Sequence, residues 1–330
     1  MSRRLQIVAL LVVGALLLTF PLYGERFYIQ FVSRILLMAI FAGSLNLLVG
    51  YTGLVSLGHA AFFGIAGYVL ALYSPPAQAA GFWSSLAVSV GGAALCALVI
   101  GALVLRTRGI FFIMATLAFA EMLFYLFHDT DIAGGSDGIY IHQRPLLDIF
   151  GWQPLDLADA THFYYLALMM TAAVMFLLRV ILRSPFGQVI VGIRVNEQRM
   201  RALGFETFGY KLVCFVLAGA LAGLAGYLAA VQFGVVNPEM LGWHLSGSVL
   251  MMVIIGGMGT LTGPVLGALM MMVLEEVFQT LTRHWQFLTG AVIVLVALYL
   301  PGGLAGLWSR LFAVRPSISG TSPGTERRSV

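Results

Sequence analysis

Long apolar runs separated by short polar segments dominate the chain. A helix needs about 20 apolar residues to cross a bilayer, and such runs occur at roughly 5–22, 28–49, 54–73, 82–105, 109–128, 162–182 and 211–233. The run at 245–281 is too long for one span and is interrupted by the glycine-rich stretch 256–264, so we predict two helices that meet there. A last run covers 286–300. The pattern predicts an all-α polytopic membrane protein of about ten transmembrane helices, some of them broken at glycine-rich stretches.

Charge distribution gives this fold an orientation. The chain is 60% hydrophobic and 10% charged, against about 25% charged in soluble domains. Of 18 basic residues, Arg34 lies inside a span, and Arg26, Arg144 and Arg283 fall on the side opposite the N-terminus. The others share the N-terminal side: Arg3, Arg4, Arg106, Arg108, Arg179, Arg183, Arg194, Arg199, Arg201, Lys211, Arg310, Arg315, Arg327 and Arg328. By the positive-inside rule we expect both termini in the cytoplasm. The net charge of +4 then reflects topology and does not indicate nucleic-acid binding.

The same pattern predicts the domain organisation. Residues 1–311 form one transmembrane domain, with a cytoplasmic loop at 183–211 and a disordered cytoplasmic tail at 312–330 that is rich in Ser, Pro, Gly and Arg. Arg3 and Arg4 precede an apolar run without a clear cleavage site, so we expect an uncleaved first helix. The longest external loop, 129–160, is acidic. Cys96 and Cys214 lie in apolar runs and imply no disulfide.

The polar island 183–211 contains the signals of a short isolated helix. Pro185 ends the preceding helix, Asn196 can cap a new one, and Glu197 suits its first turn. Arg201 follows Glu197 at the favourable spacing of four, and Gly204 supplies a C-terminal stop. A helix over 197–203 has about two turns and is marginal alone in water. We therefore predict a docking element whose contacts come from Arg194, Asn196, Glu197, Arg201, Ala202 and Gly204. The alternative is a positive loop that only fixes topology.

Two glycine-rich stretches predict broken helices, one at 46–64 and one at 256–264. Non-helical backbone persists at membrane depth only where protein or a water-filled cavity satisfies it, and such breaks often mark a transport path. Their mutual similarity is too weak to indicate a repeat. Candidate path residues are Asn46, Gly50, Gly53, Ser56, His59, Gly256, Gly259 and Gly263, together with Glu121 in the middle of its span. His59 is alternatively a hydrogen-bonded helix partner, and Glu121 alternatively pairs with Arg34.

Small residues recur at helical spacing in several spans. Gly219, Gly223 and Gly226 lie on one run, Gly263 and Gly267 on another, and Ala93, Ala97 and Gly101 on a third. Such spacing lets helix backbones approach closely. We expect tight packing within this chain, with an interface to a partner helix as the alternative.

Several chemistries find no support in the sequence. Lys211 is the only lysine and follows no phosphate-binding loop motif, so the chain is not itself an ATPase. Neither a zinc-protease motif nor a Cys-x-x-Cys pair occurs, and we expect no metal site. Residues 134–138 match Gly-x-Ser-x-Gly, but they lie in an external loop, where a turn is the ordinary explanation.

Four stretches, in order, carry a family resemblance: 45–64 (LNLLVGYTGLVSLGHAAFFG), 134–139 (GGSDGI), 193–204 (IRVNEQRMRALG), and NPE at 237–239 followed by GGMGTLTGPVLGA at 256–268. Together they resemble the permease subunit of bacterial ABC uptake systems for branched-chain amino acids. The family also includes permeases for urea, short amides and other amino acids. One departure is Arg199-Met200, where relatives often carry alanines.

The resemblance implies an inner-membrane transport subunit that is not an enzyme. The short helix would be the coupling helix seated on a cytoplasmic ATPase, which would bind the ATP and Mg²⁺, so this chain needs no cofactor of its own. Expected partners are a second related permease, two ATP-binding subunits and a periplasmic binding protein that docks on loops 129–160 and 234–245 and supplies most of the specificity. The competing interpretations are an ATP-independent secondary carrier and a structural membrane scaffold.

Overall fold

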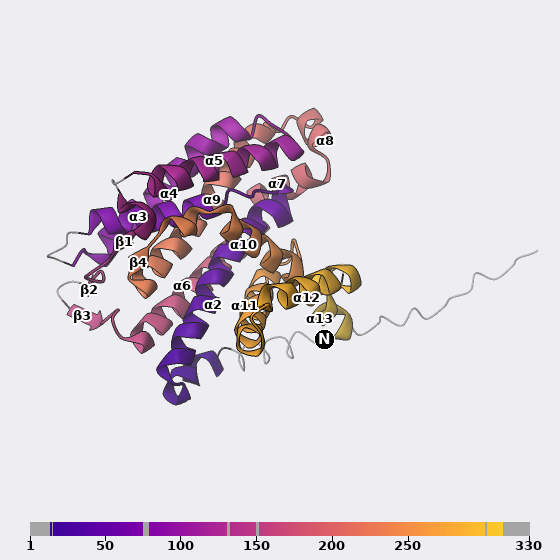
Figure 1. Ribbon diagram of the computed structural model, residues 1–330. Coiled ribbons are helices and arrows are strands. Elements are labelled where there is room, and N and C mark those ends of the chain that lie inside the picture. The colour runs from indigo at the N-terminus through magenta and orange to yellow at the C-terminus, as the bar shows by residue number, and fades with distance from the viewer. Residues whose placement is uncertain are drawn as a thin grey trace, which may run out of the picture.

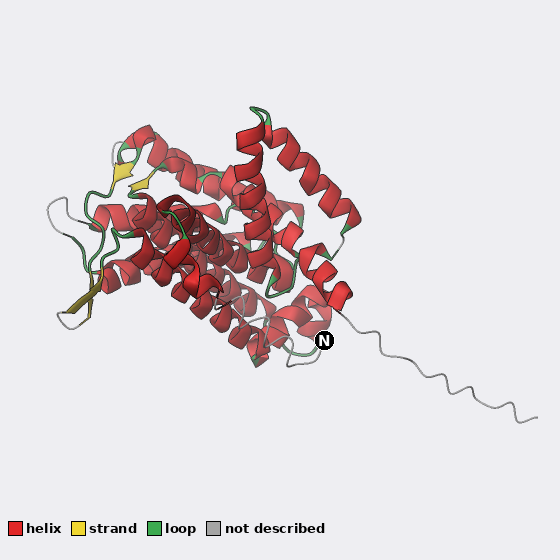
Figure 2. Cartoon of the chain, turned by 90° about the horizontal axis from the view of Figure 1, so that it is seen from below, coloured by secondary structure: helices red, strands yellow, loops and turns green. Residues whose placement is uncertain are grey.

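The computed structural model describes residues 14, 16–74, 79–130, 133–149, 152–300 and 302–312. This part of the chain is a bundle of helices with short strands at one end (Figures 1 and 2). The first predicted span, 5–22, lies mostly outside the described residues. The helices are, in order, α2 (Arg26–Asn46), the π-helical turn η1 (Leu47–Thr52), α3 (Ala60–Tyr73), α4 (Phe82–Val104), α5 (Ile110–His128), α6 (Ala160–Arg183), α7 (Pro185–Val195), α8 (Glu197–Ala202), α9 (Thr207–Phe233), α10 (Trp243–Gly256), α11 (Gly263–Leu281), α12 (Trp285–Tyr299) and α13 (Gly303–Phe312).

The predicted membrane architecture is confirmed at the level of an all-α polytopic fold. Within the described residues, six helices are long and apolar enough to cross a bilayer: the continuous α2–η1 segment, α4, α5, α6, α9 and α11. Four shorter apolar helices accompany them, namely α3, α7, α10 and α12. The long apolar run 245–281 divides into α10 and α11 at the predicted glycine-rich break. The apolar run at 54–73 suggests that the helix after the first break begins near residue 54. In the structure, residues 53–59 are not α-helical, so the break is longer and α3 begins after it.

The α2–η1 segment and α9 form the centre of the bundle. In the most apolar window of each span, 89% of the α2–η1 residues are buried, against 17% for the peripheral α5. Small residues on α9 bring it close to its neighbours: a Cβ on Gly219 or Gly223 would overlap Ala97 or Ala93 of α4, and one on Gly226 would overlap the Phe63 carbonyl of α3. The small-residue spacing therefore serves packing within this chain.

Short strands at the end of the molecule away from α7 and α8 depart from the all-α expectation (Figure 1). Strand β1 (Ile139–Tyr140), from the loop after α5, pairs antiparallel with β4 (Val235–Val236), which follows α9. Strands β2 (Leu147–Ile149) and β3 (Trp152–Leu155) form a hairpin. A short 3-10 helix, η4 (Pro238–Leu241), follows β4. The described part of the predicted 129–160 loop is therefore joined to the 234–241 segment by backbone hydrogen bonds.

Two helices, α7 and α13, were missing from the sequence prediction. Pro185 does end α6, but it also occupies the first position of α7, where a missing N–H costs nothing. Ser184 caps α7 by accepting a hydrogen bond from Gly187 N at 3.3 Å. Helix α13 begins at Gly303, the last residue of the Pro-Gly-Gly stretch that was expected to end the last span. The tail predicted from 312 onward lies outside the described residues beyond Phe312.

Candidate functional site

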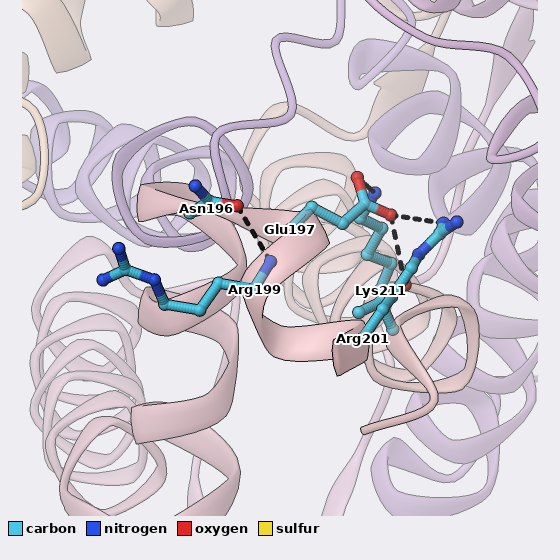
Figure 3. A network of polar contacts seen from close by, with 6 residues as sticks. Asn196, Glu197, Arg199, Arg201 and Lys211 are labelled. Atoms are coloured by element: carbon cyan, nitrogen blue, oxygen red, sulfur yellow. Dashed lines mark hydrogen bonds and ion pairs between the residues drawn. The ribbon is translucent and has the colours of Figure 1, made fainter. Parts of the chain in front are cut away.

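Helix α8 has the N-terminal cap and the C-terminal stop that the sequence predicted. The Asn196 side chain accepts a hydrogen bond from Arg199 N at 2.9 Å and caps the first turn (Figure 3). The last turn closes as a Schellman motif, in which Phe205 N donates to Met200 O at 3.1 Å and Gly204 N to Arg201 O at 2.9 Å. Gly204 has a φ of +90°, which a side chain would strain. The helix ends at Ala202, one residue short of the predicted bound.

Glu197 fastens α8 to the beginning of α9. Its two carboxylate oxygens lie 2.6 Å from Arg201 Nη2 and 2.6 Å from Lys211 Nζ, and Thr207 Oγ1 donates to it at 3.1 Å (Figure 3). Burial alone raises the pKa of Glu197, but hydrogen bonding and charge from Lys211, with Thr207 and Arg201, outweigh it and leave the pKa below its ordinary value. The carboxylate is therefore ionised at neutral pH. Only the Arg201 contact was predicted from the sequence.

Helix α8 also rests on α7 while exposing its other face. The Met200 sulphur lies against Gly192, where an added Cβ would be 2.7 Å from it. Gln198, Arg199, Ala202 and Gly204 are exposed, and so are three apolar residues around the helix, with exposed fractions of 79% for Val195, 66% for Leu203 and 37% for Phe205. Helix α8 is thus held against α7 and α9 on one side and exposes basic and apolar residues on the other.

The first interruption of the helices follows α2. The π-helical turn η1 ends at Thr52 and is followed by Gly53, which has a φ of +79°. Thr52 Oγ1 donates to Leu47 O at 3.0 Å, and Leu54 N to Leu48 O at 3.0 Å, so part of the freed backbone is satisfied locally. At its other end, α3 is capped from α10, because Ser246 Oγ accepts from Ala60 N at 2.8 Å.

The second interruption is a tight turn between the antiparallel helices α10 and α11. Gly257 and Gly259 have φ values of +113° and +76°. Thr260 Oγ1 donates to Gly257 O at 2.8 Å and accepts from Gly263 N at 3.1 Å. A Cβ on Gly256 would overlap the Gly263 carbonyl oxygen, so glycine is required where the two helices approach each other.

The structure brings the two interruptions together. Asn46, at the end of α2, is 2% exposed and reaches the second interruption, where its Nδ2 donates to Thr260 O at 2.9 Å and its Oδ1 accepts from Gly259 N at 3.0 Å. Arg194, which the sequence grouped with the docking helix, instead sends its guanidinium toward η1, where Nη1 donates to the Gly50 carbonyl. Neither long-range contact has a signal in the sequence, since each joins positions more than 140 residues apart.

Two other path candidates are fully buried. Ser56 is 0% exposed and accepts from Gly58 N at 3.3 Å. His59 is 0% exposed, hydrogen-bonds through Nε2 to Ser44 Oγ at 2.8 Å, and stacks on Phe41 with ring centroids 5.6 Å apart. The other ring nitrogen of His59, Nδ1, is buried and has no hydrogen-bond partner among the described residues.

The charged residues within the spans do not pair as the sequence suggested. In the described part of the chain, no ion pair joins Glu121 to Arg34. Arg34 lies over the Phe233 ring, 6.0 Å from its centroid, and is close enough to Glu275 for an electrostatic interaction. Glu121 is half-buried on α5, and its Oε1 has no hydrogen-bond partner among the described residues.

A cavity of about 410 Å³ opens beside α8. It lies between the end of the first interruption, the turn linking α4 to α5, and the start of α9. Its lining includes Gly53, Arg108, Arg194, Glu197 and Lys211, so α8 and the first break share one pocket. Among the described residues, no group of His, Cys, Asp and Glu could hold a metal ion. Ser136 of the Gly-x-Ser-x-Gly match lies in a 3-10 turn between α5 and β1, which is not the strand-to-helix setting of a catalytic serine.

These features define a polytopic all-α membrane protein with two apposed helix breaks and an anchored polar helix at one end. Residues 27–297 match the family described as "Branched-chain amino acid transport system / permease component". The chain belongs to this permease family, which makes it a transport subunit and not an enzyme.

The relatives that it resembles agree with the family match. The permease protein LivM of the high-affinity branched-chain amino acid transport system of Escherichia coli K12 is 31% identical over 322 residues, which covers 92% of this chain and 75% of that protein. BraD, a permease protein of the corresponding system of Pseudomonas aeruginosa, is 26% identical over 48% of this chain and 52% of its own length. The autoinducer 2 import system permease LsrC of Escherichia coli is 26% identical over 47% of this chain and 50% of its own length. No solved structure matches the chain.

Proposed function

We propose that this chain is the membrane subunit of an ABC importer for branched-chain amino acids or a closely related small amino acid. Family membership and the substrates named for LivM and BraD support this assignment. The structural observation that carries it is α8, a helix of six residues that is capped at both ends and anchored to α9. An isolated helix of this length would not be stable in water, so its fixed position favours a role in docking.

In this proposal α8 is the coupling helix, and Asn196, Glu197, Arg201, Ala202 and Gly204 form or hold the surface that a separate ATPase contacts. That ATPase binds the ATP and Mg²⁺. The exposed basic and apolar residues of α8 suit a cleft on another protein. Closure of the ATPase pair would move α8, and its ion pair with Lys211 would carry the movement into α9 as a rigid-body displacement.

The remaining features assign the other parts of the assembly. Residues 1–311 form the membrane domain, with about ten spans, cytoplasmic termini, a coupling loop at 183–211 and a cytoplasmic tail at 312–330, as the basic residues favour. The chain pairs with a second related permease and two ATP-binding subunits in the bacterial inner membrane. A periplasmic binding protein docks on 129–160 and 234–245, two segments that β1 and β4 hold together.

The translocation path runs past the two interruptions in this proposal. Gly50, Gly53, Gly256, Gly259 and Gly263 supply non-helical backbone there, and the cavity beside Gly53 is its cytoplasmic end. Ser56 and His59 support it from the buried side, and Glu121 adds a half-buried carboxylate. Specificity resides mainly in the binding protein, because the described pocket is open and lined by side chains of both charges.

The test is uptake by the assembled complex in proteoliposomes, with radiolabelled leucine, valine and urea as probes. Glu197→Arg and Arg201→Glu are each expected to reduce leucine uptake at least tenfold and to weaken copurification of the ATPase. Their combination restores only the 197–201 pair in reverse and should recover little, because an arginine at position 197 still opposes Lys211. Arg26→Glu, a charge reversal at the far end of the molecule, is the matched control. Unchanged uptake in all three α8 variants, or accumulation by this chain alone without nucleotide, would overturn the proposal.

A further inference from the structure

Arg194 lies between α8 and the two helix interruptions. It is the penultimate residue of α7, two positions before the Asn196 cap of α8. Its Nη1 donates to the carbonyl oxygen of Gly50, and its aliphatic stem covers Gly53, where a Cβ would be 3.2 Å from the Arg194 Cγ. The side chain therefore bridges the base of α8 and the first interruption.

The Gly50 carbonyl needs such a donor from outside its own helix. The last carbonyls of a helix lack partners within it. Here η1 ends at Thr52, and the N–H of Leu54 turns back to Leu48 O, so it does not serve Gly50. A guanidinium donor makes a stronger hydrogen bond than a neutral one. The contact with Arg194 is thus the interaction that satisfies this carbonyl across the two segments.

The guanidinium of Arg194 also lies next to the second interruption. A Cβ on Gly259 would lie 2.9 Å from Arg194 Nη1 and 2.9 Å from Gly50 O, and one on Gly50 would lie 2.5 Å from Gly259 N. The two glycines and the guanidinium therefore meet with no room for another side chain. Displacement of the guanidinium therefore either breaks its hydrogen bond to Gly50 O or moves that carbonyl, which is packed against Gly259.

Asn46 fixes the two interruptions to each other. Its buried amide donates to Thr260 O and accepts from Gly259 N, so both ends of the group are used on the second interruption. Because Asn46 precedes η1 directly, its two hydrogen bonds join the two breaks, next to the place where Arg194 holds the Gly50 carbonyl.

We propose that Arg194 is a positioning residue that transmits displacement of α8 to both helix interruptions, and that Asn46 makes them move as one unit. This inference rests on the proposed function and replaces the expectation that Arg194 contacts the ATPase. Loss of Arg194 then leaves the ATPase docked and active but disconnects it from the path.

The first test compares Arg194→Met, Arg194→Lys and the control Arg179→Met, which removes an exposed arginine of α6, in the complete complex in proteoliposomes. In Arg194→Met we expect leucine uptake per ATP hydrolysed to fall about tenfold or more, with ATP hydrolysis and subunit copurification within about twofold of the wild type, since one strong hydrogen bond is worth about a factor of ten. Arg194→Lys, which keeps a charged donor, should fall in between. Parallel loss of uptake and hydrolysis, or unchanged uptake, would overturn the inference.

The second test measures the movement itself with spin labels in a Cys96→Ala, Cys214→Ala background. One label on Tyr140→Cys serves as reference for labels on Leu203→Cys of α8 or Met258→Cys of the second interruption, all three exposed. Non-hydrolysable ATP should change both distances in the wild type, and only the Tyr140–Leu203 distance in Arg194→Met. If neither distance changes in the wild type, the coupling function itself fails. If both still change in Arg194→Met, the role of Arg194 fails alone.

Discussion

The two helix interruptions use glycine in the same way but satisfy their backbones differently. At the second interruption, Thr260 closes the turn between α10 and α11 with two hydrogen bonds of its own hydroxyl. At the first, the Thr52 hydroxyl donates back to Leu47 O and also meets Cys214 Sγ of α9 at 3.0 Å, and Gly50 takes its donor from Arg194 on α7. The second break is thus closed by its own threonine, with Asn46 of α2 added from outside, whereas the Gly50 carbonyl of the first takes its donor from α7.

This difference predicts that the first interruption responds more strongly than the second when neighbouring elements move. A turn that is closed by its own hydroxyl depends less on its neighbours for its shape. A backbone segment whose carbonyl is held from outside changes when its holder moves, because an unsatisfied buried carbonyl is costly. The first interruption is therefore the one connected to α8, and the second follows it through Asn46.

The largest effect is expected from adding a methyl group where the helices of the second turn meet. A Cβ on Gly256 overlaps backbone, which cannot rotate away as a side chain can. We expect Gly256→Ala to destabilise the protein by about 3 kcal/mol, at the upper end of overpacking effects. Gly247→Ala, in the same helix with nothing within 4 Å of the added Cβ, should be neutral or stabilising. Thermal unfolding followed by gel filtration of the detergent-solubilised complex measures both, and equal stability of the two variants would refute the packing argument.

Removing the two threonine hydroxyls tests the comparison directly. Thr260→Val leaves two groups without their partner and should cost about 2 kcal/mol. Thr52→Val removes one hydrogen bond to Leu47 O and a weaker contact with the Cys214 thiol, and should cost about 1 kcal/mol. Thr260→Ser and Thr52→Ser keep the hydroxyls and serve as controls. The same unfolding assay applies. A larger loss for Thr52→Val than for Thr260→Val would mean that the first interruption is the more self-contained of the two.

Acid should act on α8, to which the first interruption is connected, before it acts on the second interruption, with the smallest effect of the three. The pKa of Glu197 is depressed in the folded state, so its stabilisation is complete above the ordinary pKa of 4.5 and is lost as pH falls through the lower folded value. Deuterium uptake of residues 197–205, corrected for intrinsic exchange, should stay constant from about pH 7 to pH 5 and rise below 4.5, while that of 256–263 stays protected. Glu197→Gln should abolish the pH response. A rise already above pH 5 would contradict the assignment.

Much of the fold was predictable because membrane spans and helix ends are encoded locally. The apolar runs gave the helices, the glycines gave both interruptions, and Asn196, Glu197 and Gly204 gave α8 with its cap and stop. Helix α7 was missed because Pro185 was taken only as a helix terminator, although proline also suits a first turn. The two-residue strands β1 and β4 are too short to produce a recognisable alternation.

The long-range contacts that define the site could not be predicted, because they are not encoded locally. Asn46 and Arg194 were both singled out, but their partners are backbone groups more than 140 positions away, and a backbone carbonyl or N–H leaves no mark in a sequence. Lys211 was recognised as the only lysine, yet its pairing with Glu197 depends on how α9 starts beside α8. Residue identity thus indicated which side chains are unusual, and only the fold indicated what they hold.

Helix α9 has a further mechanical consequence. It runs unbroken for 27 residues, about 40 Å at 1.5 Å per residue. Near the first end of α9, Lys211 forms an ion pair with Glu197. Just beyond the last residue of α9, Gly234 O accepts a hydrogen bond from Ile141 N beside the β1–β4 pair. The two surfaces of the molecule are therefore attached to one continuous helix, and a push on either reaches the other without crossing either helix interruption.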